Sequence, residues 1–252
     1  MIVKGVKTRK VTAGSGSLTQ LLDESLDSLE EDSILAITSK VAAICEGRIV
    51  PVEQAKKEDL VIRESDYYLP KNLSKYDFSF TIIHNTLIPA AGIDQSNGNG
   101  NYVLWPLDPQ KTVNDVRAYL KKRFGLKNVG VILTDSTARP LRYATEGVSI
   151  RSSGFAPINS YIGKPDLFGR TMEVSVGNVA DALAVAAVAV MGEGTEQMPL
   201  AVISDVSFVQ FQDHDPTDEE LKKFYLEHME DDLFEPFLRQ MGWREGGHRK
   251  AK

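Results

Sequence analysis

The stretch Val129-Gly130-Val131-Ile132-Leu133-Thr134-Asp135-Ser136 contains an apolar run that ends on an acid and a hydroxyl. A run of this kind predicts a buried β-strand. Earlier in the chain, Ala91-Gly92-Ile93-Asp94-Gln95-Ser96-Asn97 places a carboxylate, a hydroxyl and an amide straight after another apolar segment. Because ligand crevices of open sheets form beyond the carboxyl ends of strands, Asp94 and Asp135 are predicted to share one site. Taken singly, each acid is equally well explained as a loop residue that caps a turn.

The composition is that of an ordinary globular chain of 252 residues, of which 42% are hydrophobic. A net charge of −6 and a pI near 5.3 argue against a nucleic-acid-binding surface, which needs a basic face. The single cysteine, Cys45, provides no disulfide framework, and four scattered histidines offer no imidazole cluster. Any metal is therefore expected to be held by oxygen atoms, which favours Mg²⁺, Mn²⁺ or Ca²⁺.

The sequence shows no pattern of a targeting or membrane-spanning segment. Residues 1–11 alternate apolar and basic side chains and lack the continuous apolar core of a signal peptide. The most apolar run, residues 179–191, is too short to cross a bilayer and carries Asp181. We therefore expect a cytoplasmic protein that binds neither a membrane nor nucleic acid.

Helical and strand patterns alternate unevenly along the chain, which predicts an α+β fold rather than a regular doubly wound sheet. Ser17 is placed to cap a helix that starts at Leu18, and a short helix or turn is expected from Ser39 to Gly47. The other predicted helices are residues 113–124, an apolar helix ending at residue 192 and parts of the amphipathic last forty residues. The predicted strands are residues 34–38, 48–52, 80–84, 102–105, 129–135 and 198–204.

Two groups of charged residues have simple structural explanations. The basic cluster Arg117, Lys121, Lys122 and Arg123 is interpreted as the solvated face of its helix. The turn Gly192-Glu193-Gly194-Thr195-Glu196, taken alone, is better explained as a glycine helix cap with exposed glutamates. Its glycines also allow backbone amides to approach an anion, and its glutamates could serve a metal, so both interpretations stay open.

The chain lacks the known phosphate-binding loops, because it has no P-loop motif and no complete dinucleotide fingerprint. Arg139, Arg142 and, farther on, Arg170 suit bidentate recognition of phosphate or carboxylate through their planar guanidinium groups. Arginines at a protein surface are nevertheless the commoner case. His84 is more simply explained as a core or loop histidine than as a catalytic base.

A series of different short motifs is spread over almost the whole chain. They are Ser39-Lys40-Val41, Glu46-Gly47-Arg48, Ala91 to Asn97, Asp135-Ser136, Arg139-Pro140 with Arg142, Thr145, Gly147-Val148, Asp166, Phe168-Gly169-Arg170, Asp181 and Met191-Gly192-Glu193. This ordered set resembles the γ-glutamyl ligases that add glutamate to the precursor of the deazaflavin coenzyme F420.

The resemblance implies one unit over residues 1–252, with a two-lobed α+β fold assembled as an interlaced homodimer. It also implies a reaction that depends on GTP or ATP and on two Mg²⁺ or Mn²⁺ ions. By this resemblance the metal ligands are Asp94, Asp135, Ser136 and Glu193. The implied nucleotide contacts are Ser39, Lys40, Asn97, Met191, Gly192, Gly194, Thr195 and Glu196, and the catalytic arginines are Arg139, Arg142 and Arg170.

In the implied reaction, a γ-phosphoryl group is transferred to a carboxylate of F420-0 or of its γ-glutamyl product. The acyl phosphate then reacts with the amine of L-glutamate. Metal ions bridging phosphate oxygens and arginines facing the developing charge are what this transfer needs.

Some positions depart from the family pattern. Ala90 replaces an asparagine, Ala138 a glycine and Leu141 a tryptophan, Ile44 lies where members often have lysine, and residues 8–11 are unlike the family's segment. The pattern is similar to a divergent branch thought to act on a folate-like acceptor. Two alternatives therefore stay open, namely a ligase for a folate-like acceptor and a non-catalytic nucleotide-binding paralogue.

Overall fold

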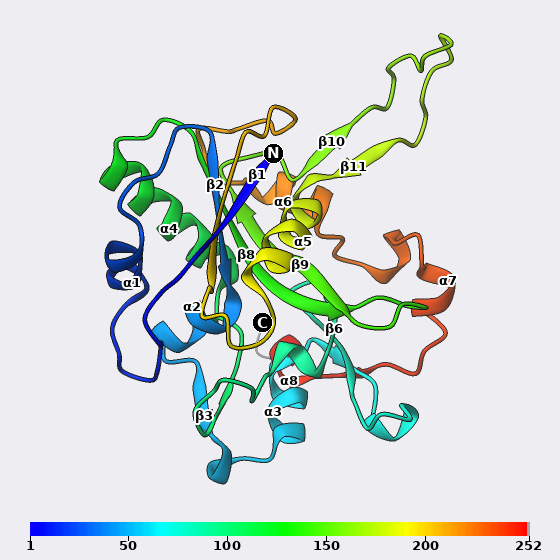
Figure 1. Ribbon diagram of the computed structural model, residues 1–252. Helices are drawn as coiled ribbons and strands as arrows, with labels where there is room; N and C mark the ends of the chain where they lie inside the picture. Colours follow the sequence, from blue (N-terminus) through cyan, green and yellow to red (C-terminus); the bar gives the residue numbers. More distant parts are fainter. Residues whose placement is uncertain (251–252) are drawn as a thin grey trace.

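The computed structural model describes the backbone of residues 1–250 and the side chains of residues 1–248. Its largest sheet has five strands in the order β1-β12-β2-β8-β9 (Figure 1). Strand β2 runs parallel to β8, whereas the other neighbours are antiparallel. The bounds are β1 Ile2–Val6, β2 Ser33–Thr38, β8 Val129–Ala138, β9 Thr145–Ser153 and β12 Leu200–Ser204.

Alternate residues of the central strands face two separate cores. In β2, Ile34 and Ala36 belong to the core shared with helix α5 (Val179–Met191), whereas Leu35 and Ile37 belong to the larger core on the other face. Burial on both faces explains why β2 and β8 are continuously apolar. The larger core also contains residues of α1 (Leu18–Ser25), α2 (Ser39–Cys45) and α4 (Pro109–Phe124). Figure 1 shows α1 and α4 on the other side of the sheet from α5.

A smaller sheet has the order β13-β4-β5-β6, and β3 forms a separate pair with β7. These strands are β3 Ile49–Pro51, β4 Tyr67–Tyr68, β5 Phe80–Ile83, β6 Thr86–Pro89, β7 Asn101–Val103 and β13 Arg244–Glu245. The helices around them are α3 Lys57–Glu64, α6 Asp218–Phe224, α7 Glu235–Leu238 and α8 Gly247–Lys250. The 3₁₀ turns are η1 Val52–Gln54, η2 Lys71–Leu73, η3 Ala90–Gly92 and η4 Met229–Asp231.

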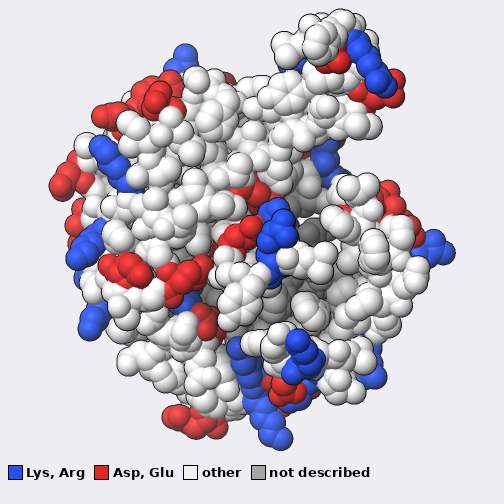
Figure 2. Space-filling view, turned by 45° about the vertical axis from the view of Figure 1, so that its right-hand side comes forward, with Lys and Arg blue, Asp and Glu red and all other residues white. Residues whose placement is uncertain are grey.

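A hairpin built on β10 (Ile158–Ser160) and β11 (Val176–Asn178) extends away from the sheets (Figure 1). Figure 2 shows it standing clear of the rest of the surface, with a hollow beneath it. Between the two strands, Leu167 is 98% exposed and Phe168 is 95% exposed. The hairpin therefore presents apolar side chains that its own chain does not cover.

The mixed α+β architecture expected from the sequence is confirmed. Ser17 caps α1 by accepting a hydrogen bond of 3.1 Å from the backbone amide of Gln20, as predicted. Strands β1, β4, β6, β9 and β13 and the hairpin strands were not predicted. The amphipathic last forty residues form only short helices. Within the part of the chain that is described, no helix has the length and apolar character needed to cross a membrane.

The interpretation of the α4 basic cluster as a solvated face is wrong for Arg117. This side chain lies in the part of the molecule where the C-terminal region packs, and the residue is only 4% exposed. It donates to Asp215 Oδ1 at 2.9 Å and to the carbonyl oxygen of Gln212 at 2.7 Å. Arg123 is also engaged, because it donates to the carbonyl oxygens of Leu22 and Leu26. The hydrogen-bond partners of both arginines are distant in sequence, so the local pattern of charges does not reveal them.

Candidate functional site

Several strand ends converge on one edge of the five-stranded sheet. Because β2 and β8 are parallel, both end at this edge, and antiparallel β12 begins there. Strand β1, antiparallel to β12, also ends there. A cavity of about 720 Å³ opens at this edge, within the range of roughly 300–1,000 Å³ that is usual for small-molecule sites. Asp94 and Asp135 both line it, as the sequence predicted.

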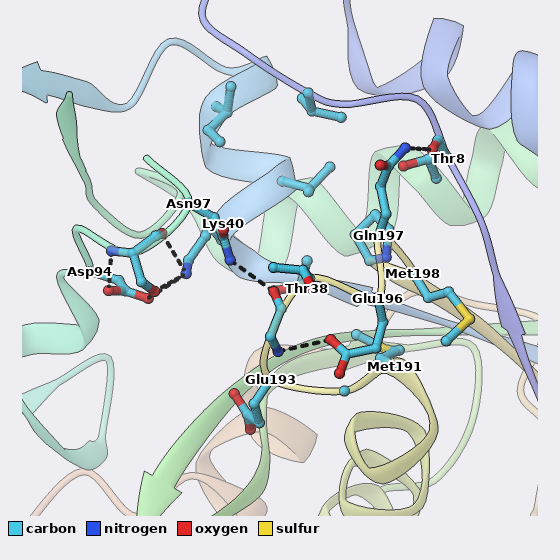
Figure 3. A pocket seen from close by; sticks show the side chains of 18 of the residues that line it. Thr8, Thr38, Lys40, Asp94, Asn97, Met191, Glu193, Glu196, Gln197 and Met198 are labelled. Atoms are coloured by element: carbon cyan, nitrogen blue, oxygen red, sulfur yellow. Dashed lines mark hydrogen bonds and ion pairs between the residues drawn. The ribbon is translucent and has the colours of Figure 1, made fainter. Parts of the chain in front are cut away.

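Asp94 and Lys40 form the polar centre of one wall (Figure 3). Lys40 Nζ ion-pairs with Asp94 Oδ2 and donates to the backbone oxygen of Ser96 at 3.0 Å. The Ser96 amide and hydroxyl donate to the two carboxylate oxygens of Asp94 at 2.8 and 2.6 Å. Burial acts to raise the pKa of Asp94, but the hydrogen bonds from Lys40 and Ser96 outweigh it and hold this pKa below its ordinary value. Asp94 is therefore a stable carboxylate, already paired with one cation.

Asp135 lies in a different environment at the end of the apolar part of β8. Trp105 Nε1 donates to Asp135 Oδ2 at 2.5 Å, and the Ser136 amide donates to Asp135 Oδ1 at 2.8 Å. Burial raises the pKa of Asp135 to about 6, and these two neutral donors only partly offset it. A nearby cation would stabilise the ionised form. Trp105 was not identified as a site residue in the sequence analysis, where it marks only the end of a predicted strand.

Gly92 explains how Trp105 reaches Asp135. Its φ of +67° is in the left-handed region, and a Cβ at this position would lie 2.1 Å from Trp105 Nε1. The indole therefore occupies the space that any other side chain at Gly92 would take. Ala90 and Ala91, just before it, also have positive φ values of 54° and 52°. An asparagine tolerates such a backbone better than alanine, so the Ala90 departure from the family pattern leaves a strained position.

The glycine turn after α5 forms the opposite wall (Figure 3). Gly192 is the C-cap of α5 with a φ of +79°, which confirms the helix-cap interpretation. The turn also lines the cavity, and Asn97 Nδ2 donates to the Gly194 carbonyl oxygen at 3.1 Å. The Gly194 amide donates to Glu196 Oε2 at 2.8 Å, so this amide is already occupied. Ser136 Oγ donates to Glu193 Oε2 at 3.2 Å, and both residues line the cavity.

The N-terminal segment closes a further side of the cavity. Residues 8–12 line it together with residues 194–199. Gln197 Nε2 donates to the Thr8 carbonyl oxygen at 2.6 Å, and the Thr8 amide donates to the Gln197 carbonyl oxygen at 3.2 Å (Figure 3). These paired hydrogen bonds hold two segments that are distant in sequence against one another.

Not every site residue that the resemblance implied lines the cavity. Ser39 is buried beneath it and is not among its lining residues. None of the three candidate arginines lines it either. Arg139 ion-pairs with Glu146, Arg142 donates to the carbonyl oxygen of Leu141, and Arg170 lies on the projecting hairpin. The residues that do meet in the cavity are Lys40, Asp94, Asn97, Asp135, Ser136, Met191, Gly192, Glu193, Gly194, Thr195 and Glu196.

The donor set around this cavity consists of oxygen atoms. Within the described residues, no three histidine, cysteine, aspartate or glutamate side chains converge as a ready metal shell. Asp94, Asp135, Ser136 and Glu193 instead face the same cavity, with Lys40 engaging one oxygen of Asp94. Carboxylate and hydroxyl oxygens suit hard divalent cations. These residues therefore fit such an ion, provided that the ion pair between Lys40 and Asp94 breaks when the ion binds.

Comparison with known proteins identifies the family of this chain. Residues 5–205 match the family described as F420-0:Gamma-glutamyl ligase. The chain is 30% identical to a coenzyme F420:L-glutamate ligase of Methanopyrus kandleri, with 77% of this chain and 82% of that protein covered. A protein of the same name from Archaeoglobus fulgidus is 34% identical, with 69% and 76% covered. The expected resemblance is confirmed: the chain is an amide-bond-forming ligase and belongs to the F420-0:γ-glutamyl ligase family.

Proposed function

We propose that this ligase joins the amine of L-glutamate to an acceptor carboxylate, with a nucleoside triphosphate and divalent cations, through an acyl phosphate. The acceptor is F420-0 or its γ-glutamyl product, and the nucleotide is GTP or ATP. The observation that carries the proposal is the meeting of Asp94, Asp135 and Glu193 with the glycine turn in one cavity of nucleotide size. The names of the relatives support the choice of substrates.

The proposed reaction has two steps. A carboxylate oxygen of the acceptor attacks the γ-phosphorus, the bond from this phosphorus to the bridging oxygen of the β-phosphate breaks, and an acyl phosphate forms. The amine nitrogen of glutamate then attacks the acyl carbon, loses a proton, and displaces inorganic phosphate. Both steps move negative charge, so positioning and electrostatic stabilisation supply most of the rate enhancement.

The chain's own groups have distinct tasks in this scheme. Asp94, Asp135, Ser136 and Glu193 would hold two Mg²⁺ or Mn²⁺ ions, and bound cations would supply charge neutralisation at the phosphates. Lys40 lies between Asp94 and Ser96, so it is placed to contact a phosphate oxygen when a cation takes over Asp94. Asn97 orients the glycine turn through the Gly194 carbonyl.

A homodimer is part of the proposal. The hairpin exposes Leu167 and Phe168 beyond the body of its own chain, and it carries Arg170 away from the cavity. Insertion of this hairpin against a second copy would cover the apolar side chains and would place Arg170 outside its own subunit. The two-lobed arrangement and the single unit over residues 1–252 are proposed on the same resemblance.

The proposal is tested with purified protein, L-glutamate, MgCl₂ or MnCl₂, GTP or ATP, and either F420-0 or a folate monoglutamate. Phosphate release is expected only when acceptor and glutamate are both present. With ¹⁸O in the acceptor carboxylate, one labelled oxygen should appear in the released phosphate, because only the acyl-phosphate route moves it. Folded protein that binds nucleotide without transferring label would instead be a non-catalytic paralogue. Activity with the folate alone would reassign the acceptor.

A further inference from the structure

The indole of Trp105, which donates to Asp135, is itself held in place by other residues. Trp105 is 2% exposed, and Arg48 Nε donates to its carbonyl oxygen at 3.0 Å. The imidazole ring of His84 stacks on the indole, with the ring centres 6.3 Å apart and the ring planes at 16°. This spacing is within the range of roughly 4.5–7 Å that is usual for aromatic pairs. Tilting of the indole toward this face would displace the His84 ring.

The backbone around His84 is fixed on both sides. His84 and Asn85 form the two-residue turn between β5 and β6, with φ values of 48° and 59°. Two positive φ values are typical of the hairpin turn that matches the twist of its strands. The His84 amide donates to Asp66 Oδ2 at 3.0 Å, and Arg151 donates to the His84 carbonyl oxygen at 3.0 Å. The position of the imidazole ring is therefore well defined.

The C-terminal segment, residues 244–248, approaches this turn closely. Its strand β13 pairs with β4, and α8 lies against α3 (Figure 1). The Gly246 amide donates to the Asp66 carbonyl oxygen at 2.9 Å. A Cβ at Gly246 would lie 2.1 Å from the carbonyl oxygen of Ser65, so only glycine permits this approach.

His248, in this segment, contacts both His84 and its anchor Asp66. The His248 ring packs edge-on against the His84 ring, with the centres 4.8 Å apart and the planes at 68°. His248 Nδ1 donates to Asp66 Oδ1 at 3.0 Å, since a carboxylate can only accept. The side chains of His248 and Asp66 are only 19% and 13% exposed, so water competes little for this hydrogen bond. One carboxylate thus holds both histidines.

These contacts form a continuous series from His248 through His84 and Trp105 to Asp135. His248, His84 and Trp105 do not line the cavity that contains Asp135, so they can affect its chemistry only through that carboxylate. The family match ends at residue 205, so His248 lies outside the matched part of the chain. The series therefore connects a segment beyond the family match to a proposed metal ligand.

We propose that His84 and His248 are positioning residues, which hold Trp105 and through it orient Asp135 toward a divalent ion. This inference rests on the proposed ligase function, in which Asp135 is a metal ligand. Replacing a group that orients a metal ligand typically changes metal affinity or activity by roughly 10–100-fold. His84 acts one contact farther away, so we expect a change of about threefold to tenfold on the same basis.

The test uses the full chain with Trp243→Phe, which leaves Trp105 as the single tryptophan. Mn²⁺ is titrated without nucleotide, and quenching of Trp105 fluorescence gives an apparent Kd. His84→Ala should raise this Kd about threefold to tenfold and lower kcat by a similar factor, with the KM for L-glutamate unchanged. His84→Phe should restore most of both values, because a ring again covers the indole. Alanine and phenylalanine bear the same cost of a positive φ, so their comparison isolates the ring.

A second pair of variants leaves the His84 turn intact and tests the C-terminal segment. His248→Ala and Gly246→Ala should each raise the Kd for Mn²⁺ about threefold, because the first removes the ring and the second displaces the segment. The matched controls are His228→Ala, which changes an exposed histidine, and Gly242→Ala, where a Cβ would meet no atom within 4 Å. Both controls should bind Mn²⁺ as the parent protein does. Thermal unfolding establishes that each variant is folded at the assay temperature.

The outcomes are distinguishable from failure of the ligase proposal. If the predicted changes in Mn²⁺ affinity occur while the parent protein has no ligase activity, the positioning role stands and the proposed function fails. If the parent is an active ligase but His248→Ala and Gly246→Ala match it in Kd and kcat, the positioning role is overturned. It is also overturned if His84→Phe binds Mn²⁺ as weakly as His84→Ala, or if Mn²⁺ does not quench Trp105.

Discussion

Trp105 Nε1 donates to Asp135 Oδ2 at 2.5 Å, so a residue just beyond β7 holds the carboxylate at the end of the apolar part of β8. The contact connects two segments 30 residues apart. It also depends on Gly92, whose missing side chain leaves room for the indole. The position of Asp135 in the cavity is thus determined by packing between β8, the turn η3 and the segment that follows β7.

Gly92→Ala should displace Trp105 from Asp135. The new Cβ would overlap the indole, so we expect the free energy of unfolding to fall by about 2–4 kcal/mol and turnover to fall at least tenfold. Urea unfolding and initial rates check this. Gly14→Ala is the matched control, because Gly14 has a φ of +71° with open space around it and should lose only about 1 kcal/mol. Equal losses in the two variants would contradict the steric explanation.

Asp135→Asn should remove a pH dependence of the free energy of unfolding and should also abolish most of the turnover. Burial raises the pKa of Asp135 from 3.8 to about 6 in the folded protein, so the folded state holds the proton more tightly than the unfolded state. Without metal, the wild type should therefore lose about 3 kcal/mol of stability as pH rises from about 4 to above 6. The variant should lack this loss and should also lose turnover by several orders of magnitude.

Urea unfolding at pH 4 and pH 8 in the presence of a chelator measures this difference. The comparison uses the change between the two pH values, so a constant cost of the amide side chain cancels. A variant that keeps the full pH dependence of the wild type would show that another group causes it. A variant that does not fold at either pH would mark Asp135 as structural.

Mn²⁺ should quench the fluorescence of Trp105. The chain has two tryptophans, and Trp105 touches the proposed metal ligand Asp135, whereas Trp243 donates to the carbonyl oxygen of Leu238. In Trp243→Phe the quenching should persist and saturate with added Mn²⁺. Asp94→Asn should weaken the apparent Mn²⁺ affinity by tenfold or more, because the site loses a charged ligand. Quenching that Asp94→Asn leaves unchanged would place the ion elsewhere.

Arg117→Met should destabilise the protein without changing the chemistry at the cavity. Removing this buried guanidinium takes one of two donors from Asp215 and the side-chain donor from the Gln212 carbonyl, which should lower the free energy of unfolding by about 3 kcal/mol. Lys122→Met on the same helix is the control, since Lys122 is exposed and should change stability by less than about 0.5 kcal/mol. Denaturant unfolding and kcat of the folded variants provide the measurement. Similar stability in both variants would show that the hydrogen bonds of Arg117 to Asp215 and Gln212 do not stabilise the fold.

Leu167→Ser combined with Phe168→Ser should weaken the proposed homodimer. Both side chains are almost fully exposed on the hairpin, and burying them against a second copy would contribute several kcal/mol. Sedimentation over a range of protein concentrations should show a dimer for the wild type and a larger monomer fraction for the double variant. Leu107→Ser changes an exposed leucine outside the hairpin and should leave the association intact. A monomeric wild type would overturn the dimer proposal.

Local patterns in the sequence predicted much of the framework. The continuous apolar runs of β2 and β8 identify strands buried on both faces, and Ser17 marks the start of α1. The acids that follow apolar runs predicted that Asp94 and Asp135 meet, and the motifs identified the family. These features could be predicted because strand periodicity, caps and motif order depend on residues that are close in sequence.

Only the tertiary structure determined what each of these groups contacts. Arg117 has its partners about 95 residues later in the chain, the candidate arginines lie outside the cavity, and Trp105 reaches Asp135 through space left by Gly92. Burial and hydrogen bonding between distant segments depend on the three-dimensional positions of both partners, which the residue types in a local window do not specify.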